Sequence, residues 1–363
     1  MILALDAMGG DYGPAENCLG AIEACRKFPD LDIALVGDTD RIGSAIDSVE
    51  TSIKGRLHIV SAEESISMDE SPARAIRSKR RSSLRLAMEM VRSGEAGGCI
   101  SAGNTGAIVA GGVLVVGRIS GIDRPGLGVV LPTLEKPTLL IDVGATIRCK
   151  PINLSQFAVM GSLFMKHMVG VSQPDVRLLS NGSEEIKGDE VISEARAMLV
   201  ENSHVDFGGY IEGNGVPFGH ADVVVCDGFS GNVMLKSFEG LGELALKILK
   251  NEVDKRILAK MGLVFFLPML KDLQHRFDYQ RFGGTPLLGV NGAVIKAHGR
   301  SKAPAITSAL GVARDFVLKN GVSKIKEEIT DLLPGERTFD GVASGTIRPS
   351  GGNRDGGSGE SDG

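Results

Sequence analysis

The chain has 363 residues, of which 42% are hydrophobic, and its formal net charge is −5 at pH 7. That length provides for one large α/β unit or two closely joined lobes, and the acidic balance argues against nucleic acid as the main partner. The five cysteines form no C-x-x-C pair, so we expect reduced thiols. The first residues, MILALDAMGG, lead straight into a strand without a basic leader and a long apolar core, so we expect no signal peptide. No window approaches the roughly 20 apolar residues that span a bilayer, so we expect no spanning helix.

Apolar strands alternate with segments of helical spacing along most of the chain. The expected strands are 2–5, 32–36, 57–60, 98–100, 128–131, 138–142, 175–179, 205–211, 223–226 and 289–295. The expected helices are 15–28, 41–52, 72–91, 108–116, 154–169, 189–199, a long stretch after 241 that is interrupted near Gly262 and Pro268, and 304–333. This alternation predicts an α/β fold with parallel sheets covered by helices.

Three of the expected strands end in polar glycine loops that lead into helices, namely 101–107 (SAGNTGA), 142–146 (DVGAT) and 227–232 (DGFSGN). Ligands bind at the carboxyl ends of parallel strands, and backbone N–H groups at a helix start favour an anion. One such loop is explained by a tight turn alone, but three with Ser, Asn, Thr and Asp favour an anion site. None matches a phosphate loop or a dinucleotide fingerprint, so nucleotide binding is not predicted.

Few side chains offer other chemistry. Lys187 in SEEIKGDE and Lys150 in RCKP are either solvated surface residues or point charges that stabilise an oxyanion. His298, beside Lys296, is either a site residue or a structural histidine. The six histidines show no metal-ligand spacing, so we expect no metal and no cofactor.

Three further segments stand out by their composition. The apolar run 262–270 (GLVFFLPML) is either a core or dimer-interface helix, or an amphipathic segment that enters a membrane interface. The basic run 79–81 is either a solvated helix face or a dock for an acidic protein partner. Residues 334–363, rich in Gly, Ser, Asp and Arg, predict a disordered tail.

Eight motifs carry a family resemblance. In chain order they are LDAMGGD (5–11), SAGNTGA (101–107), VGRISGIDRP (116–125), DVGA (142–145), QFAVMGS (156–162), EEIKGDE (184–190), DVVVCDGFSGNVMLK (222–236) and YQRFGGTPLLGVNGAVIKAHG (279–299). With these motifs the chain from residue 1 to about 333 resembles the phosphate acyltransferases of bacterial phospholipid synthesis.

The resemblance implies a single α/β unit over 1–333, similar in fold to the isocitrate dehydrogenase and phosphotransacetylase group, with a helical, partly apolar protrusion over about 241–278. It implies a homodimer that transfers a fatty acyl group from acyl carrier protein to inorganic phosphate, without a cofactor. The family lysine of the IKG motif falls on Lys187 and the family asparagine of DGF-x-GN falls on Asn232, our two catalytic predictions. The expected substrate-binding residues are Asp6, Gly9, Gly10, Ser101, Asn104, Thr105, Gly106, Asp142, Gly144, Lys150, Asp227, Gly228, Ser230, Gly231, Lys296 and His298.

The resemblance also implies a cytoplasmic protein, peripherally attached to the inner face of the cell membrane, where a downstream glycerol-phosphate acyltransferase is a further partner. The expected membrane contacts are Leu263, Val264, Phe265, Phe266 and Leu267. Two alternatives remain open: a membrane-attached scaffold for acyl carrier protein and lipid enzymes, and an NAD-dependent dehydrogenase of related fold, which would need a cluster of metal-binding aspartates.

Overall fold

A computed structural model describes residues 1–182, 189–255 and 284–332. The chain divides into two units, Met1–Leu333 and Pro334–Gly363, and all the described residues belong to the first. The predicted catalytic Lys187, the predicted membrane contacts between Leu263 and Leu267, and the predicted tail all lie outside the described residues.

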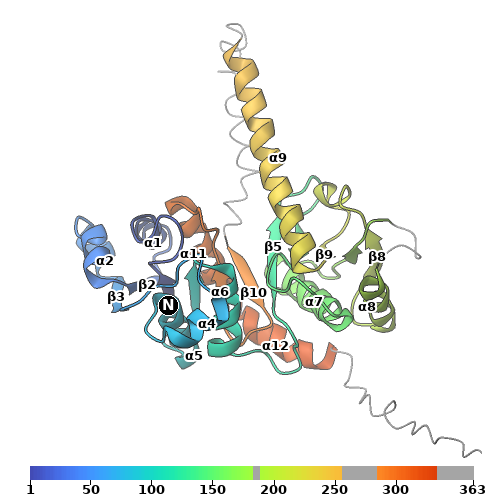
Figure 1. Ribbon diagram of the computed structural model, residues 1–363, viewed down its shortest axis with the longest axis horizontal. Coiled ribbons are helices and arrows are strands. Elements are labelled where there is room, and N and C mark those ends of the chain that lie inside the picture. Colours follow the sequence, from blue (N-terminus) through green and yellow to red (C-terminus); the bar gives the residue numbers. More distant parts are fainter. Residues whose placement is uncertain (183–188, 256–283, 333–363) are drawn as a thin grey trace, which may run out of the picture. The chain divides into compact units, whose positions relative to one another are not determined.

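The described strands form one sheet in the order β3-β2-β1-β4-β11-β10-β5-β6-β9-β7-β8 (Figure 1). They are β1 Ile2–Asp6, β2 Asp32–Gly37, β3 Leu57–Ser61, β4 Gly98–Ser101, β5 Gly126–Leu131, β6 Thr138–Ile141, β7 Val176–Leu179, β8 Phe207–Ile211, β9 Val223–Val225, β10 Thr285–Leu288 and β11 Ala293–Lys296. Strands β3, β2, β1, β4 and β11 form one parallel block, and β6, β9, β7 and β8 form a second. Antiparallel β10 and β5 join the blocks, so the sheet is mixed rather than wholly parallel.

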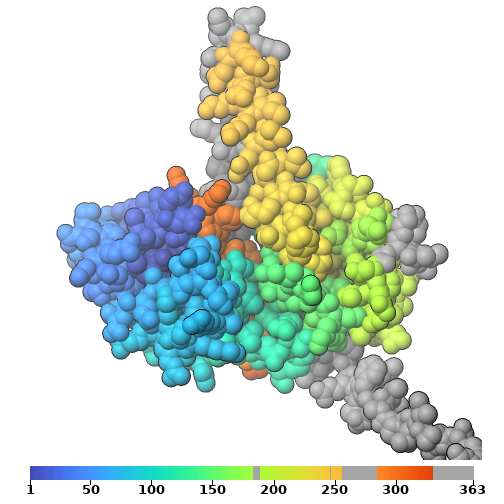
Figure 2. All heavy atoms as spheres, in the orientation of Figure 1, coloured from blue at the N-terminus to red at the C-terminus, as the bar shows by residue number. Residues whose placement is uncertain are grey.

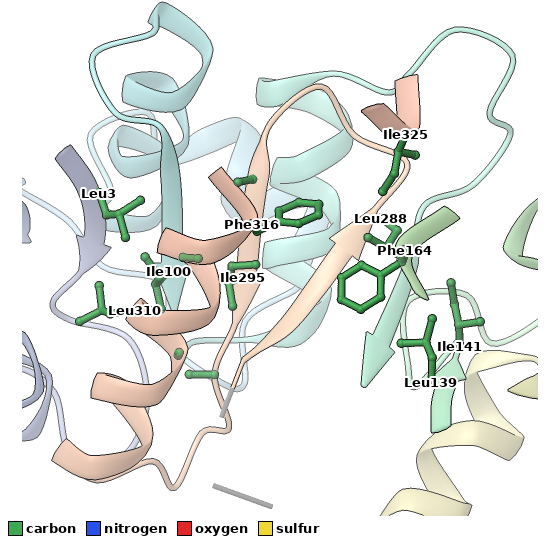
Figure 3. Close-up of a cluster of buried hydrophobic side chains, with 14 of the residues drawn as sticks. Leu3, Ile100, Leu139, Ile141, Phe164, Leu288, Ile295, Leu310, Phe316 and Ile325 are labelled. Atoms are coloured by element: carbon green, nitrogen blue, oxygen red, sulfur yellow. The ribbon is translucent and has the colours of Figure 1, made fainter. Parts of the chain in front are cut away.

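Both faces of the sheet are covered, as strands that are apolar on both sides require. Leu3 and Leu5 of β1 are buried in one hydrophobic cluster, while Ala4 between them is buried in a second cluster. The first cluster continues through both strand blocks, from Leu3 and Ile100 to Leu139 and Ile141 (Figure 3). One continuous core therefore supports both sets of strand ends, where the candidate site lies.

Helices connect the strands and cover the sheet (Figure 1). They are α1 Ala15–Lys27, α2 Thr39–Ile46, α3 Thr51–Lys54, α4 Pro72–Ser78, α5 Ser83–Ser93, α6 Thr105–Gly111, α7 Pro151–Phe164, α8 Glu190–Glu201, α9 Gly228–Asp254, α11 Ala303–Leu318 and α12 Gly321–Leu332. π-Helical turns at Gly112–Val116 and Met165–Val169 extend α6 and α7, and Val216–Phe218 is a short 3-10 helix. Helices α1 and α11 pack closely at Gly20, because a Cβ there would lie 2.6 Å from the Cβ of Ile306.

Two expected elements are divided in the structure. The single helix expected over 72–91 is α4 and α5, separated at residues 79–82, where Ser83 N–H donates to Glu64 O at 3.0 Å. The single strand expected over 289–295 is the end of a hairpin, in which β10 precedes the turn and β11 follows it. Asn291-Gly292 in that turn is a typical hairpin dipeptide.

Helix α9 begins at the glycine turn and continues without interruption to Asp254. Its second half projects away from the sheet (Figures 1 and 2), where Leu241, Leu244 and Ile248 are 61%, 53% and 54% exposed. Among the described residues, no helix combines the length and hydropathy needed to cross a bilayer.

Candidate active site

Asp142 organises the loop that follows β6. Its side chain has no exposed surface, and its two oxygens accept hydrogen bonds from the backbone N–H groups of Leu127, Gly144, Ala145 and Thr146, at 2.6 to 3.1 Å. Burial raises the pKa of the Asp142 carboxyl to about 6, although the four N–H groups oppose this shift. Asp142 therefore fixes the conformation of the 142–146 loop, and its influence on a substrate is through the position of that loop.

The turn after β9 is closed in the same way. Asp227 accepts from the N–H groups of Phe229 and Ser230 at 2.9 Å and from the Ser230 hydroxyl at 2.6 Å. Gly228 N–H donates to Thr146 O at 2.8 Å, and Gly231 N–H donates to Asp227 O at 3.0 Å. The first four N–H groups of α9 thus all have partners within the chain. This differs from the expectation that the turn presents free amides to an anion, because Asp227, the first residue of the motif, caps the helix itself.

The third carboxylate, Asp6 at the end of β1, joins the loops after β1 and β4. The Ser101 hydroxyl donates to Asp6 Oδ2 at 2.7 Å, and Gly103 N–H donates to Ser101 Oγ at 3.0 Å. Burial raises the pKa of Asp6, against hydrogen bonds from Ser83, Ser101 and the backbone. A Cβ at Gly9 would lie 2.7 Å from Asp6 Oδ2, so the close approach of these loops requires glycine there.

The loops at the strand ends form two hydrogen-bonded groups, and among the described residues a contact of Lys236 with His298 links the two groups. The loops after β1, β4 and β11 are joined by Ser101–Asp6, by Ala297 N–H to Ser101 O at 2.8 Å and by Asp11 N–H to Gly299 O at 2.9 Å. The loops after β6 and β9 are joined by the Gly228–Thr146 bond. Lys236 of α9 connects the groups, because its Nζ lies 2.6 Å from Nε2 of His298. The predicted site residues of both groups therefore belong to one region of the molecule.

Asn232 lies over the 142–146 loop on the first turns of α9. A Cβ at Gly144 would lie 4.0 Å from both Cβ and Oδ1 of Asn232. The Asn232 side chain is exposed and forms no hydrogen bond with any residue that the structure describes. Its amide is consequently open to a ligand.

The remaining predicted residues have clear local roles. Asn104 caps α6 by accepting from Ala107 N–H at 3.1 Å, and its amide donates to Met68 O at 3.0 Å. Thr105 and Gly106 form the first turn of α6, and Lys150 is exposed immediately before α7. The buried thiols of Cys99 and Cys226 have pKa values raised well above the ordinary range by burial, so they are not poised nucleophiles. Within the described ranges, no group of three His, Cys, Asp or Glu side chains has the arrangement of a metal site.

Two residues of the basic run 79–81, which lies between α4 and α5, and Arg85 on α5 pair with acidic residues. The ion pairs are Lys79–Glu70 at 2.7 Å, Arg81–Glu63 at 3.1 Å and Arg85–Glu89 at 2.8 Å. Docking of an acidic partner on this face remains a prediction.

Lys236 is the site residue that sequence reasoning missed. It lies at the end of the motif DVVVCDGFSGNVMLK, one helical turn after Asn232, and that i,i+4 spacing places both on one face of α9. Its contact with His298 spans 62 positions of sequence and has no local signal.

The raised pKa of Asp142 predicts a pH dependence of stability. The folded carboxyl binds its proton below about pH 6, and the unfolded carboxyl only near its ordinary pKa of 3.8. Its stabilising contribution is therefore complete below 3.8 and lost as the pH rises through 6, a change of up to about 3 kcal/mol. Asp142→Asn carries no titrating proton at this position. Between pH 4 and 7 the free energy of unfolding, measured with urea, should therefore fall more steeply with pH in wild type than in Asp142→Asn, by up to that amount in total.

Ser155→Ala is the matched control, because Ser155 Oγ is buried without a hydrogen-bond partner and carries no charge. It is expected to keep the wild-type slope. Equal slopes for wild type and Asp142→Asn would contradict the raised pKa.

The fold is shared with several enzymes of solved structure. A phosphotransacetylase from Streptococcus pyogenes has a TM-score of 0.58 at 16% identity, covering 88% of this chain and 94% of that one. A branched-chain phosphotransacylase from Enterococcus faecalis (0.53, 15%, 87% and 99%) and a 4-hydroxythreonine-4-phosphate dehydrogenase from Klebsiella pneumoniae (0.50, 12%, 87% and 99%) share the architecture. Because transacylases and a dehydrogenase share it, the fold alone does not choose between these reactions.

Sequence comparison gives the family. A model described as "Fatty acid synthesis protein" matches residues 1–324. The phosphate acyltransferase of Heliobacterium modesticaldum is 47% identical over 329 residues, covering 91% of this chain and 98% of the relative. The phosphate acyltransferase of Geobacter sulfurreducens is 42% identical over 344 residues, covering 94% and 98%. The chain belongs to the phosphate acyltransferase family, as its motifs predict.

Proposed function

We propose that this enzyme transfers a fatty acyl group from the thioester of acyl carrier protein to inorganic phosphate, giving an acyl phosphate for phospholipid synthesis. The observation that carries the proposal is the 47% identity over 98% of the length of a phosphate acyltransferase, which leaves no large part of that relative unmatched. The proximity of Asn232 to the 142–146 loop supports it further, since it places an exposed amide beside a loop ordered by Asp142.

The reaction needs few groups. A phosphate oxygen attacks the thioester carbonyl, a C–O bond forms, the C–S bond breaks, and the proton of hydrogen phosphate passes to the departing thiolate. The protein must hold the phosphate, stabilise the oxyanion and orient the two reactants. Asn232, whose amide forms no hydrogen bond with the described residues, polarises the carbonyl, and Lys187 neutralises the developing charge. The loops ordered by Asp6, Asp142 and Asp227 form the walls against which the thioester is aligned.

The enzyme works as a homodimer at the inner face of the membrane, in contact with the downstream glycerol-phosphate acyltransferase. The exposed leucines on the second half of α9 support an apolar protrusion that leads toward the predicted membrane contacts. Asn104, Lys150 and the glycines of the three loops contribute to substrate binding.

Thiol release from a long-chain acyl-acyl carrier protein tests the proposal. Release that requires inorganic phosphate, with no metal or nucleotide added, is the expected result, and Lys187→Ala should reduce it strongly. Phosphate-independent release would indicate a thioesterase instead. Carrier binding without any release would favour the scaffold, and fluorescence-detected nicotinamide binding would favour the dehydrogenase.

A further inference from the structure

A group of basic side chains lies where α9 meets the end of β11. Lys236 Nζ is 2.6 Å from His298 Nε2 and 2.5 Å from Glu239 Oε2. Lys296, the last residue of β11, is in register with Ser101 at the end of β4. Lys236, Lys296 and His298 are called the basic cluster below.

Within the part of the chain that the structure describes, acidic side chains do not fully compensate the basic cluster. Lys296 forms no hydrogen bond or ion pair with any of the residues described, and burial followed by the Lys236 charge lowers its pKa to about 8. Burial, Lys236 and Lys296 also lower the pKa of His298, so its ring is neutral at pH 7. Glu239, the acidic group that raises the pKa of both Lys296 and His298, already pairs with Lys236.

The neutral imidazole of His298 does not offer the Lys236 ammonium a hydrogen-bond acceptor either. Arg300 N–H donates to His298 Nδ1 at 3.1 Å, so a neutral ring carries its hydrogen on Nε2. Nε2–H then faces the Lys236 ammonium, which is also a donor. An acceptor oxygen beside the pair, within reach of both nitrogens, would satisfy both groups.

The amides of two of the three glycine loops are already engaged within the chain. Asp142 accepts from the N–H groups of Gly144, Ala145 and Thr146, and Asp227 accepts from those of Phe229 and Ser230. Besides the Asn232 amide, the basic cluster offers side-chain donors beside these loops, and their charge suits an anion. A phosphate dianion carries several acceptor oxygens and the charge that two lysines compensate.

We propose that the basic cluster is the seat of inorganic phosphate, with Lys236 and Lys296 binding its oxygens and His298 donating from Nε2. This assignment rests on the proposed acyl transfer, because it places that reaction's nucleophile. Asn232 and Lys236 are four residues apart on α9, so their Cβ atoms lie about 5–6 Å apart on one helix face. The helix thus presents the thioester carbonyl and the attacking phosphate side by side.

Steady-state kinetics of the full-length enzyme test the seat. Lys236→Met and Lys296→Met are each expected to raise the KM for inorganic phosphate about tenfold or more, since each loses a hydrogen bond between charged groups. The KM for the acyl thioester should stay within about twofold of wild type. Lys236→Arg should recover most of the phosphate affinity. The matched control is Lys247→Met, an exposed lysine on the same helix beyond the site, which should change neither constant.

The prosthetic arm of acyl carrier protein contains a phosphodiester, which could bind the basic cluster in place of inorganic phosphate. The experiment must distinguish these two ligands. With an N-acetylcysteamine acyl thioester, which has no phosphodiester, the rise in phosphate KM should persist. If the lysine variants change only the KM for acyl carrier protein, the cluster holds the carrier and our assignment is wrong.

Calorimetric titration with inorganic phosphate separates this inference from the proposed reaction. Wild type that binds phosphate, with binding lost in Lys236→Met, supports the seat even if no thiol is released. Phosphate-dependent thiol release with unchanged phosphate KM in both lysine variants supports the reaction and overturns the seat. Because Lys236 is exposed, its variant decides the question if Lys296→Met fails to fold.

Discussion

Gly231→Ala is expected to destabilise the protein and abolish most of its acyl transfer. A Cβ at residue 231 would lie 1.9 Å from the backbone oxygen of Asp142 and 2.7 Å from Sγ of Cys226. The first obstacle is main chain of the very loop that Asp142 orders, so the start of α9 must move away from it. Overpacking of this kind costs about 1–3 kcal/mol in the free energy of unfolding, and the displaced helix carries Asn232 and Lys236 with it.

Gly240→Ala, in the same helix, is the control. No atom of the described residues lies within 4 Å of a Cβ at Gly240, and alanine in an exposed helix interior is favoured by up to about 1 kcal/mol. Urea unfolding should therefore show opposite signs for the two variants. Similar free energies of unfolding for Gly231→Ala and Gly240→Ala would show that α9 does not approach Asp142 as closely as described.

The closing of the glycine loops shows what the sequence could and could not predict. The strand–loop–helix order at 101–107, 142–146 and 227–232 follows from apolar runs that stop at glycine-rich turns, and the structure has it. The loops were expected to offer free amides to an anion. Asp6, Asp142 and Asp227 stand at the ends of their strands, and a short carboxylate in that position binds nearby backbone N–H groups. That local signal was present and pointed to loop order rather than to ligand contact.

Other features depend on contacts between distant parts of the chain. The antiparallel join of β10 and β5 places residues 285–288 beside 126–127, and no local pattern in either strand gives that pairing. The Lys236–His298 contact is similar, because helical spacing puts Lys236 on the same face as Asn232 but does not say what that face meets. Sequence reasoning therefore predicts the glycine loops and the place of Asn232 at the start of α9. The approach of α9 to His298 comes only from the tertiary structure.

Asn232→Ala is expected to lower kcat by about 10²–10³, the usual effect of removing one preorganised oxyanion donor. The side chain is exposed and forms no hydrogen bond with the described residues, so the free energy of unfolding should stay within about 0.5 kcal/mol of wild type. Large loss of turnover without loss of stability is the signature of a group that touches the reacting atoms rather than one that supports the fold.

Ser237→Ala controls for position, since Ser237 is exposed on α9 one residue beyond Lys236, and it should leave both turnover and stability unchanged. Asn232→Asp tests the chemistry at nearly constant volume. An aspartate keeps an acceptor but loses the N–H donor and adds a negative charge beside the developing oxyanion, so its kcat should fall at least as far as that of Asn232→Ala. The KM for phosphate should change little in Asn232→Ala, because the lysines of the basic cluster remain. Turnover within a few-fold of wild type in both asparagine variants would remove Asn232 from the reaction and leave Lys187 to polarise the carbonyl.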